Sequence, residues 1–145
     1  MRIIFTCVAW EDTSKKLNSI LKEFNDFFGI QFLDKFYGSN ITECQVTVIA
    51  VDSDIDRSQN SKIAKKSNVV GSFKHLINGK KIRYIGFGLE YLHEDIVSKD
   101  IKILTALICS SLCRKLDNAD IKIPKDFDYQ KFSYDLKMEL KRYMR

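Results

Sequence analysis

The chain has 145 residues, a length typical of one domain, and we expect a single domain spanning residues 1–145. Hydrophobic residues make up 45% of the sequence and aromatic residues 12%, which excludes an intrinsically disordered chain. The net charge is +5, but residues 1–60 carry −3 and residues 61–145 carry +8, so the sequence predicts a dipolar surface that orients a charged partner.

Compartment signals in the sequence favour the cytoplasm. No stretch approaches the roughly 20 apolar residues that a membrane span requires, so we expect no membrane association. The apolar run near the N-terminus is too short for a secretory signal core. The cysteines show no disulfide-scaffold spacing and are interpreted as buried thiols, which is typical of a reducing location. They are Cys7, Cys44, Cys109 and Cys113.

The first third of the chain predicts a strand, a helix and two further strands. The run Arg2–Trp10 is almost entirely apolar, as expected for an interior strand covered on both faces. Acidic and hydroxyl residues then favour a helix start, and apolar residues follow at helical spacing until Gly29, which offers a C-terminal stop. Ile30–Tyr37 and Glu43–Val51 have the composition of the next two strands.

A polar segment and a hairpin are predicted for the middle of the chain. Residues 52–68 are polar throughout, which indicates an exposed loop within the domain. Val69–Ile77 and Lys80–Leu89 flank Asn78-Gly79, the strongest sequence signal for a two-residue hairpin turn. Counting back from that turn predicts four cross-strand pairs. They are Phe73 with Tyr84, Gly71 with Gly86, Lys74 with Arg83, and Leu76 with Lys81.

The last third predicts two helices and a short edge strand. Ser98 can cap a helix that runs to about Lys115, and its middle, Ile103–Leu112, is apolar almost all round. Asn118–Ile123 is interpreted as an edge strand, and a final amphipathic helix begins near Asp128. The expected fold is therefore α+β: a largely antiparallel sheet of five or six strands, with an N-terminal helix, a buried central helix and a C-terminal helix packed on it.

Catalytic and metal-binding patterns are weak, so we expect no catalytic residue, no metal and no cofactor. His75 is expected in mid-strand opposite Ile82, and His93 in a polar segment. Asp52, Asp54 and Asp56 alternate as calcium-loop ligands do, but the glycine and terminal glutamate of such a loop are missing. A metal-dependent hydrolase remains a third interpretation, and it would use Glu43 or Asp52 with Lys62 around a divalent ion.

The strongest functional signal is a segment of single charge sign. Residues 57–89 contain eight basic side chains and no acidic one, which indicates an anionic partner. With aromatic residues interleaved along the predicted ribbon, this segment would suit a phosphate backbone as well as an acidic protein surface. A basic nucleic-acid-binding accessory domain is therefore the alternative to a protein-binding function.

In overall character the chain resembles immunity proteins of bacterial polymorphic toxin and contact-dependent growth inhibition systems. The resemblance is carried by the apolar strand Arg2–Trp10, the Phe-rich first helix and the charged stretch Arg57–Leu89. It implies a cytosolic, non-enzymatic protein that binds a cognate toxin domain and blocks its active site or its access to substrate.

Either the acidic or the basic residues could form the contact with the toxin. The chain could act as a monomer, or as a homodimer through an exposed strand edge such as Ile121–Ile123. An interface needs about 800 Å² on each partner, with an aromatic or arginine anchor near its centre, for which Trp10 is a further candidate. The candidate contact residues are Lys65, Lys66, Lys74, Lys80, Lys81, Arg83, Asp52, Asp54, Asp56 and Tyr91.

Overall fold

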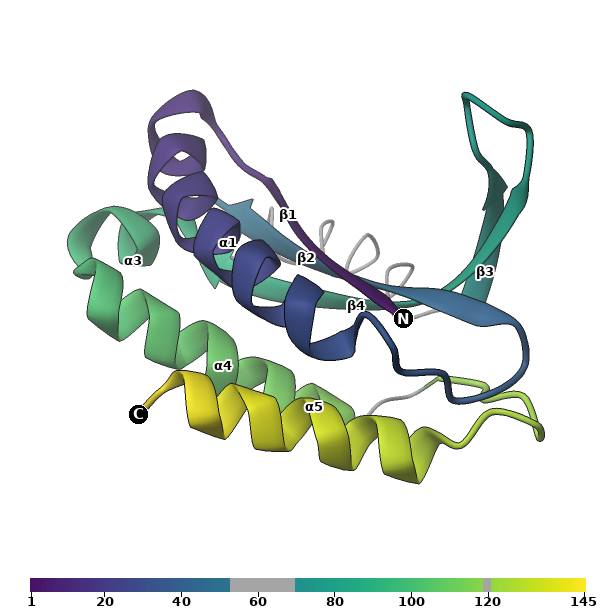
Figure 1. Cartoon of the computed structure of the whole chain (residues 1–145). Helices are drawn as coiled ribbons and strands as arrows, with labels where there is room; N and C mark the ends of the chain where they lie inside the picture. Colours follow the sequence, from purple (N-terminus) through teal and green to yellow (C-terminus); the bar gives the residue numbers. More distant parts are fainter. Residues whose placement is uncertain (53–69, 119–120) are drawn as a thin grey trace.

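The computed structural model describes residues 1–52, 70–118 and 121–145. Within these residues a four-stranded sheet in the order β1-β2-β4-β3 carries helices α1, α4 and α5 on one side (Figure 1). The elements are β1 (Arg2–Val8), α1 (Glu11–Phe32), β2 (Ile41–Val51), β3 (Val70–Lys74), β4 (Lys81–Leu92), α3 (His93–Ser98), α4 (Ile101–Asp117) and α5 (Tyr129–Tyr143). The α+β class is confirmed.

The sheet is mixed, so the prediction of five or six largely antiparallel strands is wrong. β1 pairs with β2 and β2 with β4 in parallel, and only β3 runs antiparallel to β4. Helix α1 provides the crossover that a parallel β1–β2 pair requires. The predicted strand Ile30–Tyr37 does not form, because α1 continues through Gly29 and buries Phe32 on the same stripe as Phe28. Ile121–Ile123, predicted to lie in an edge strand, also forms no strand.

The sequence predicts that β1 is an interior strand, and this prediction is wrong. β1 lies at the edge of the sheet. Its buried positions alternate with more exposed ones, and Val8 is 54% exposed. Asn25 of α1 pairs with the backbone of this edge strand. Its Oδ1 accepts from the Phe5 N–H at 2.7 Å, and its Nδ2 donates to the Phe5 carbonyl at 3.0 Å. The side chain therefore takes the place of a neighbouring strand at one residue.

An aromatic cluster joins the helices to the sheet. The ring of Phe5 lies 5.1 Å from Phe24 and 5.5 Å from Phe28, and Tyr143 of α5 closes over both helical rings at 4.9 and 5.8 Å. The Phe24 and Tyr143 rings meet edge-to-face and the other three pairs are tilted, so the cluster combines large apolar burial with favourable ring geometry. The periodic Phe residues of α1 thus build the centre of the core.

Helix α4 is buried on one side only, which corrects the expectation of a helix buried all round. Leu104 and Ile108 are buried, whereas Ile101 and Ile103 are about half exposed. The cap of α4 is Asp100, whose side chain accepts from the Ile103 N–H, and the predicted cap Ser98 ends α3 instead. Helix α5 begins after Asp128, as the sequence predicted.

The predicted hairpin is present, but its register differs by two residues. Tyr84 pairs with Gly71 and Lys81 with Lys74, so the connection spans residues 75–80. A two-residue turn of this type needs positive φ at both central residues. Gly79 has a φ of 66°, whereas Asn78 does not have positive φ, and its side chain accepts from the Lys80 N–H instead. The longer connection also removes His75 from mid-strand.

Candidate functional site

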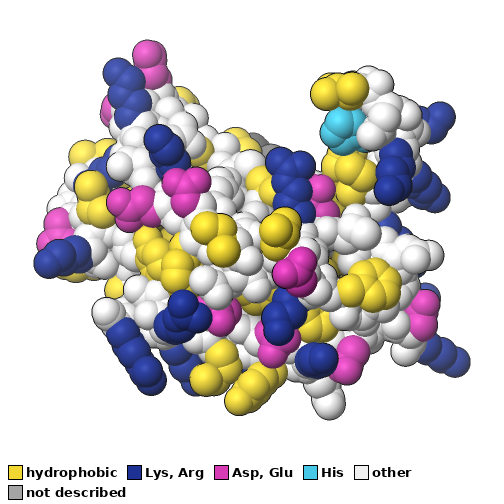
Figure 2. Space-filling view, in the orientation of Figure 1, with side chains coloured by type: hydrophobic (Ala, Val, Ile, Leu, Met, Phe, Trp, Pro, Cys, Tyr) yellow, Lys and Arg dark blue, Asp and Glu magenta, His cyan; other side chains and the backbone are white. Residues whose placement is uncertain are grey.

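The β3–β4 hairpin, residues 70–85, projects from the molecule. Figure 1 shows it rising away from the helical layer, and Figure 2 shows apolar atoms at its end with Lys or Arg side chains along its flank. Three predicted contact residues lie exposed on it: Lys74, Lys80 and Lys81. Lys74 and Lys81 are directly opposite in the register, and within the described residues no carboxylate pairs with any of the three. The flanks form a compact cationic surface.

The hairpin tip, residues 75–79, presents two aliphatic side chains that sequence reasoning missed. Leu76 is 101% exposed and Ile77 is 89% exposed, the highest values among the large apolar residues of the described part. A signal for them existed, because adjacent aliphatic residues beside Asn-Gly are unusual where turn composition is normally polar. The interpretation of this stretch as strand assigned both residues to the ribbon.

Arg83 braces the hairpin at its base. Its Nη1 donates to the carbonyl of Ser39 at 2.8 Å and to the hydroxyl oxygen of Ser39 at 2.7 Å. Ser39 has a left-handed φ of 55°, in the turn that precedes β2. The Tyr84 ring lies across Gly71, where an added Cβ would come within 2.8 Å of its oxygen. Arg83 and Tyr84 therefore hold the direction of the hairpin, and the Arg83 guanidinium is already engaged.

The other predicted contact residues are not gathered at the hairpin. The Tyr91 hydroxyl donates to the Leu107 carbonyl at 3.2 Å, its ring packs against the core, and burial raises its pKa to about 12. Asp52 is exposed and follows β2. Four further residues lie outside the described part of the chain: Lys65, Lys66, Asp54 and Asp56.

Acidic residues gather at the opposite end of β4. The first turns of α1 and α3 carry Glu11, Asp12, Glu94 and Asp95. β4 has 12 residues, so at a rise of about 3.3 Å per residue the path along the strand from Lys81 to this end is roughly 36 Å. Trp10 is 46% exposed there, and its ring packs edge-on against His93 at 5.1 Å. We call this the acidic end, although Lys16 also lies there and donates to the Val97 and Lys99 carbonyls, and the basic projection lies at the other end of β4.

The imidazoles and the buried carboxylate have local structural contacts. His93 Nε2 lies 3.8 Å from an Asp12 carboxylate oxygen, and His75 Nδ1 accepts from the Ile77 N–H at 3.3 Å. Glu43 is buried and accepts a hydrogen bond from the Gln45 amide. Within residues 1–52, 70–118 and 121–145, no three His, Cys, Asp or Glu side chains are placed to share a metal ion.

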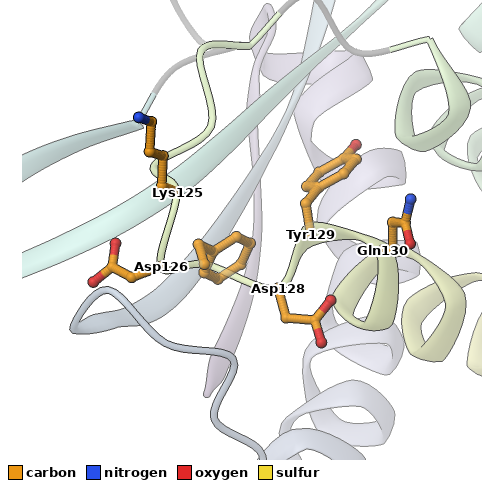
Figure 3. Close-up of a pocket in the computed structure, with 6 residues that line it drawn as sticks. Lys125, Asp126, Asp128, Tyr129 and Gln130 are labelled. Atoms are coloured by element: carbon orange, nitrogen blue, oxygen red, sulfur yellow. The ribbon is translucent and has the colours of Figure 1, made fainter.

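A shallow hollow of about 430 Å³ precedes α5, and residues 125–130 line it (Figure 3). The labelled side chains in Figure 3 do not converge on one point. Asp128 accepts from the Lys131 N–H as the cap of α5, and the Tyr129 hydroxyl donates to the Leu116 carbonyl at 2.6 Å. Both polar groups therefore serve the fold, and the hairpin remains the better candidate site.

A family model described as Immunity protein 44 matches residues 1–142. The chain belongs to this family. The match runs from β1 to the last helix and includes the hairpin, so the resemblance to immunity proteins is confirmed, and an immunity role in general follows. No curated protein and no solved structure matches the chain. Among the described helices of this family member, none combines the length and apolar character needed to cross a bilayer.

Proposed function

We propose that this member of the Immunity protein 44 family neutralises a cognate toxin domain by binding it directly, without catalysing a reaction. The match across residues 1–142 carries the proposal, because it concerns an immunity protein and spans nearly the whole chain. We expect the protein to act in the cytoplasm of the protected bacterial cell, as part of a contact-dependent growth inhibition or related polymorphic toxin system.

The hairpin flanks are the contact surface that we propose. Lys74, Lys80 and Lys81 extend from the molecule, and their ammonium groups have no carboxylate partner among the described residues. Fields from such a surface raise the rate of encounter with an acidic patch. Asp12 at the acidic end, in contrast, already faces His93. The projection of the hairpin from the molecule favours the basic end over the acidic end as the first contact (Figure 1).

Co-expression tests the function. The C-terminal toxin domain encoded beside the gene for this chain would be induced in a bacterial host with and without the protein. Growth should be restored only in its presence, and the two purified proteins should elute as a complex in size-exclusion chromatography with light scattering. Growth arrest that persists at excess protein, with no complex, would refute neutralisation by binding.

Charge reversal tests the lysines. Lys80→Glu with Lys81→Glu should slow association with the toxin domain by about tenfold or more at low salt, with a smaller effect at high salt because counter-ions screen the field. The matched control is Lys22→Glu with Lys131→Glu, which changes net charge equally on exposed helical positions. If both pairs slow association equally, net charge and not the hairpin is responsible.

Nucleic-acid binding is the second candidate, and one observation favours it. The ring centroids of Phe73 and Tyr84 lie 6.0 Å apart on the same ribbon as the lysines. Proteins that bind single-stranded nucleic acid combine aromatic rings, which stack on bases, with basic side chains, which contact phosphates. A titration of labelled single-stranded DNA at two salt concentrations distinguishes the candidates. Phosphate contacts produce a steep loss of affinity with salt for any sequence, whereas we expect no appreciable binding at physiological salt.

A further inference from the structure

We infer that the hairpin tip enters an apolar cleft on the partner whose rim carries carboxylates. The inference rests on the proposed function and adds the chemistry of the surface that the protein recognises. Its starting point is the exposure of Leu76 and Ile77, which bury almost nothing in the chain itself. Exposed aliphatic side chains at the end of a projection contribute favourable hydrophobic free energy only when a partner covers them.

The tip is held in one shape by its own hydrogen bonds. The His75 N–H donates to the Lys80 carbonyl at 2.7 Å, and the Gly79 N–H donates to the His75 carbonyl at 2.9 Å. Side chains complete the turn, because Asn78 accepts from the Lys80 N–H and His75 accepts from the Ile77 N–H. A loop ordered before binding loses little conformational entropy in the complex. Leu76 and Ile77 are therefore presented ready for insertion.

The braced base lets the hairpin insert as a rigid body. Arg83 ties β4 to Ser39, and the Tyr84 ring covers Gly71 while lying 6.0 Å from Phe73. The Arg83 hydrogen bonds link the projecting ribbon to the turn before β2, and the Tyr84 contacts join the two strands of the ribbon. The tip and its flanks thus move with the body of the domain, and binding energy is not spent on ordering the ribbon.

The charges around the tip define the rim of the cleft. Lys74 and Lys80 lie on either side of the aliphatic pair in the chain, and residues 70–83 contain no acidic side chain. Lys74 and Lys81 face each other across the two strands, an unfavourable pair that nearby carboxylates would relieve. A cleft with an apolar floor and an acidic rim satisfies both parts of the surface. A phosphate backbone offers no such floor, and stacking on bases requires rings, not aliphatic chains.

The first test removes the aliphatic contacts. Leu76→Ala with Ile77→Ala in the full chain should weaken binding to the purified toxin domain about 100-fold, mainly by faster dissociation, because two buried aliphatic side chains are truncated. The matched control is Ile30→Ala with Leu33→Ala, the same residue types at 76% and 73% exposure on α1 and the turn after it. The control should change affinity less than twofold. Both variants should unfold at the wild-type denaturant concentration, since exposed positions contribute little to stability.

The second test identifies what the tip touches. A photo-crosslinking amino acid at position 76 should couple to a partner peptide with apolar residues flanked by Asp or Glu, and the same probe at position 30 should not couple.

The outcomes separate the inference from the proposed function. If wild-type protein binds and protects but the Leu76→Ala, Ile77→Ala variant does so equally well, the inference is wrong and the proposed function stands. If wild-type protein neither binds nor protects, the proposed function fails too. Tip-dependent binding to single-stranded DNA or to anionic phosphatidylglycerol vesicles instead of the toxin domain would also overturn the inference.

Discussion

Replacing Asn25 by alanine tests whether α1 secures the edge strand β1. The side chain makes two hydrogen bonds to Phe5, at 2.7 and 3.0 Å, in a partly buried setting. Each such bond contributes about 0.5–1.5 kcal/mol net, and a buried backbone group left without a partner costs about 1–3 kcal/mol. Water can reach part of this site, so we expect Asn25→Ala to lower the free energy of unfolding by about 2–3 kcal/mol.

Asn18→Ala is the matched control for this prediction. Asn18 lies on the same helix, and its Oδ1 accepts a hydrogen bond from the Cys7 thiol at 3.4 Å, which is weak because a thiol is a poor donor. Both substitutions gain the same helix propensity, roughly 0.5 kcal/mol in favour of alanine, so the difference between the variants isolates the Phe5 contact. We expect Asn18→Ala to remain within about 0.5 kcal/mol of wild type.

Urea denaturation followed by circular dichroism measures both free energies, and hydrogen exchange reports the Phe5 amide directly. Exchange at Phe5 should accelerate in Asn25→Ala and stay unchanged in Asn18→Ala. Equal stability of the two variants, with the Phe5 amide still protected, would refute the assignment of Asn25 as the partner of the edge strand.

Asp100→Ala should cost about 1 kcal/mol of unfolding free energy, because it removes the cap that accepts from the Ile103 N–H at 2.9 Å; an unchanged urea midpoint would contradict this. Burial raises the pKa of Cys109 to about 12 and also raises that of Cys44. In an aromatic disulfide assay at pH 8, these two thiols should therefore react far more slowly in the native protein than in urea. In the native protein they should also react after Cys7 and Cys113. Similar native and urea rates would contradict their burial. Burial also raises the pKa of Tyr91 to about 12, so the unfolded state loses this proton first, near pH 10. The contribution of Tyr91 to stability should therefore be level below pH 10 and fall as the pH rises to 12. Tyr91→Phe should flatten part of that fall in pH-stepped urea titrations, and an identical slope would refute the role of Tyr91.

Local patterns predicted the elements whose signals are complete within a few residues. β2 and α5 formed nearly where expected, because an apolar strand pattern and an aspartate cap act over short distances. Ile30–Tyr37 was mistaken for a strand because a short apolar run fits a strand or a buried helix end equally well. The helical conformation is favoured because Phe28 and Phe32 continue the buried apolar stripe of α1.

For the candidate site, the cationic character of the hairpin was readable from the sequence, because charge and strand composition are properties of the residues themselves. The register of β3 and β4 could not be read from the sequence, because it depends on hydrogen bonds of Asn78 and Gly79 that replace a two-residue turn with a longer connection. The exposure of Leu76 and Ile77 followed from that register, and composition alone could not reveal it.

The amino-acid sequence by itself determined the α+β class, the single-sign segment and the likeness to immunity proteins, all of which arise from residue types and short-range order. Only the tertiary structure decided that β1 and β4 flank β2 in parallel, and that two aliphatic side chains stand at the end of a basic projection. The reason is physical: strand pairing and burial are set by contacts between residues far apart in the chain, and their free energies depend on what each surface finds opposite it.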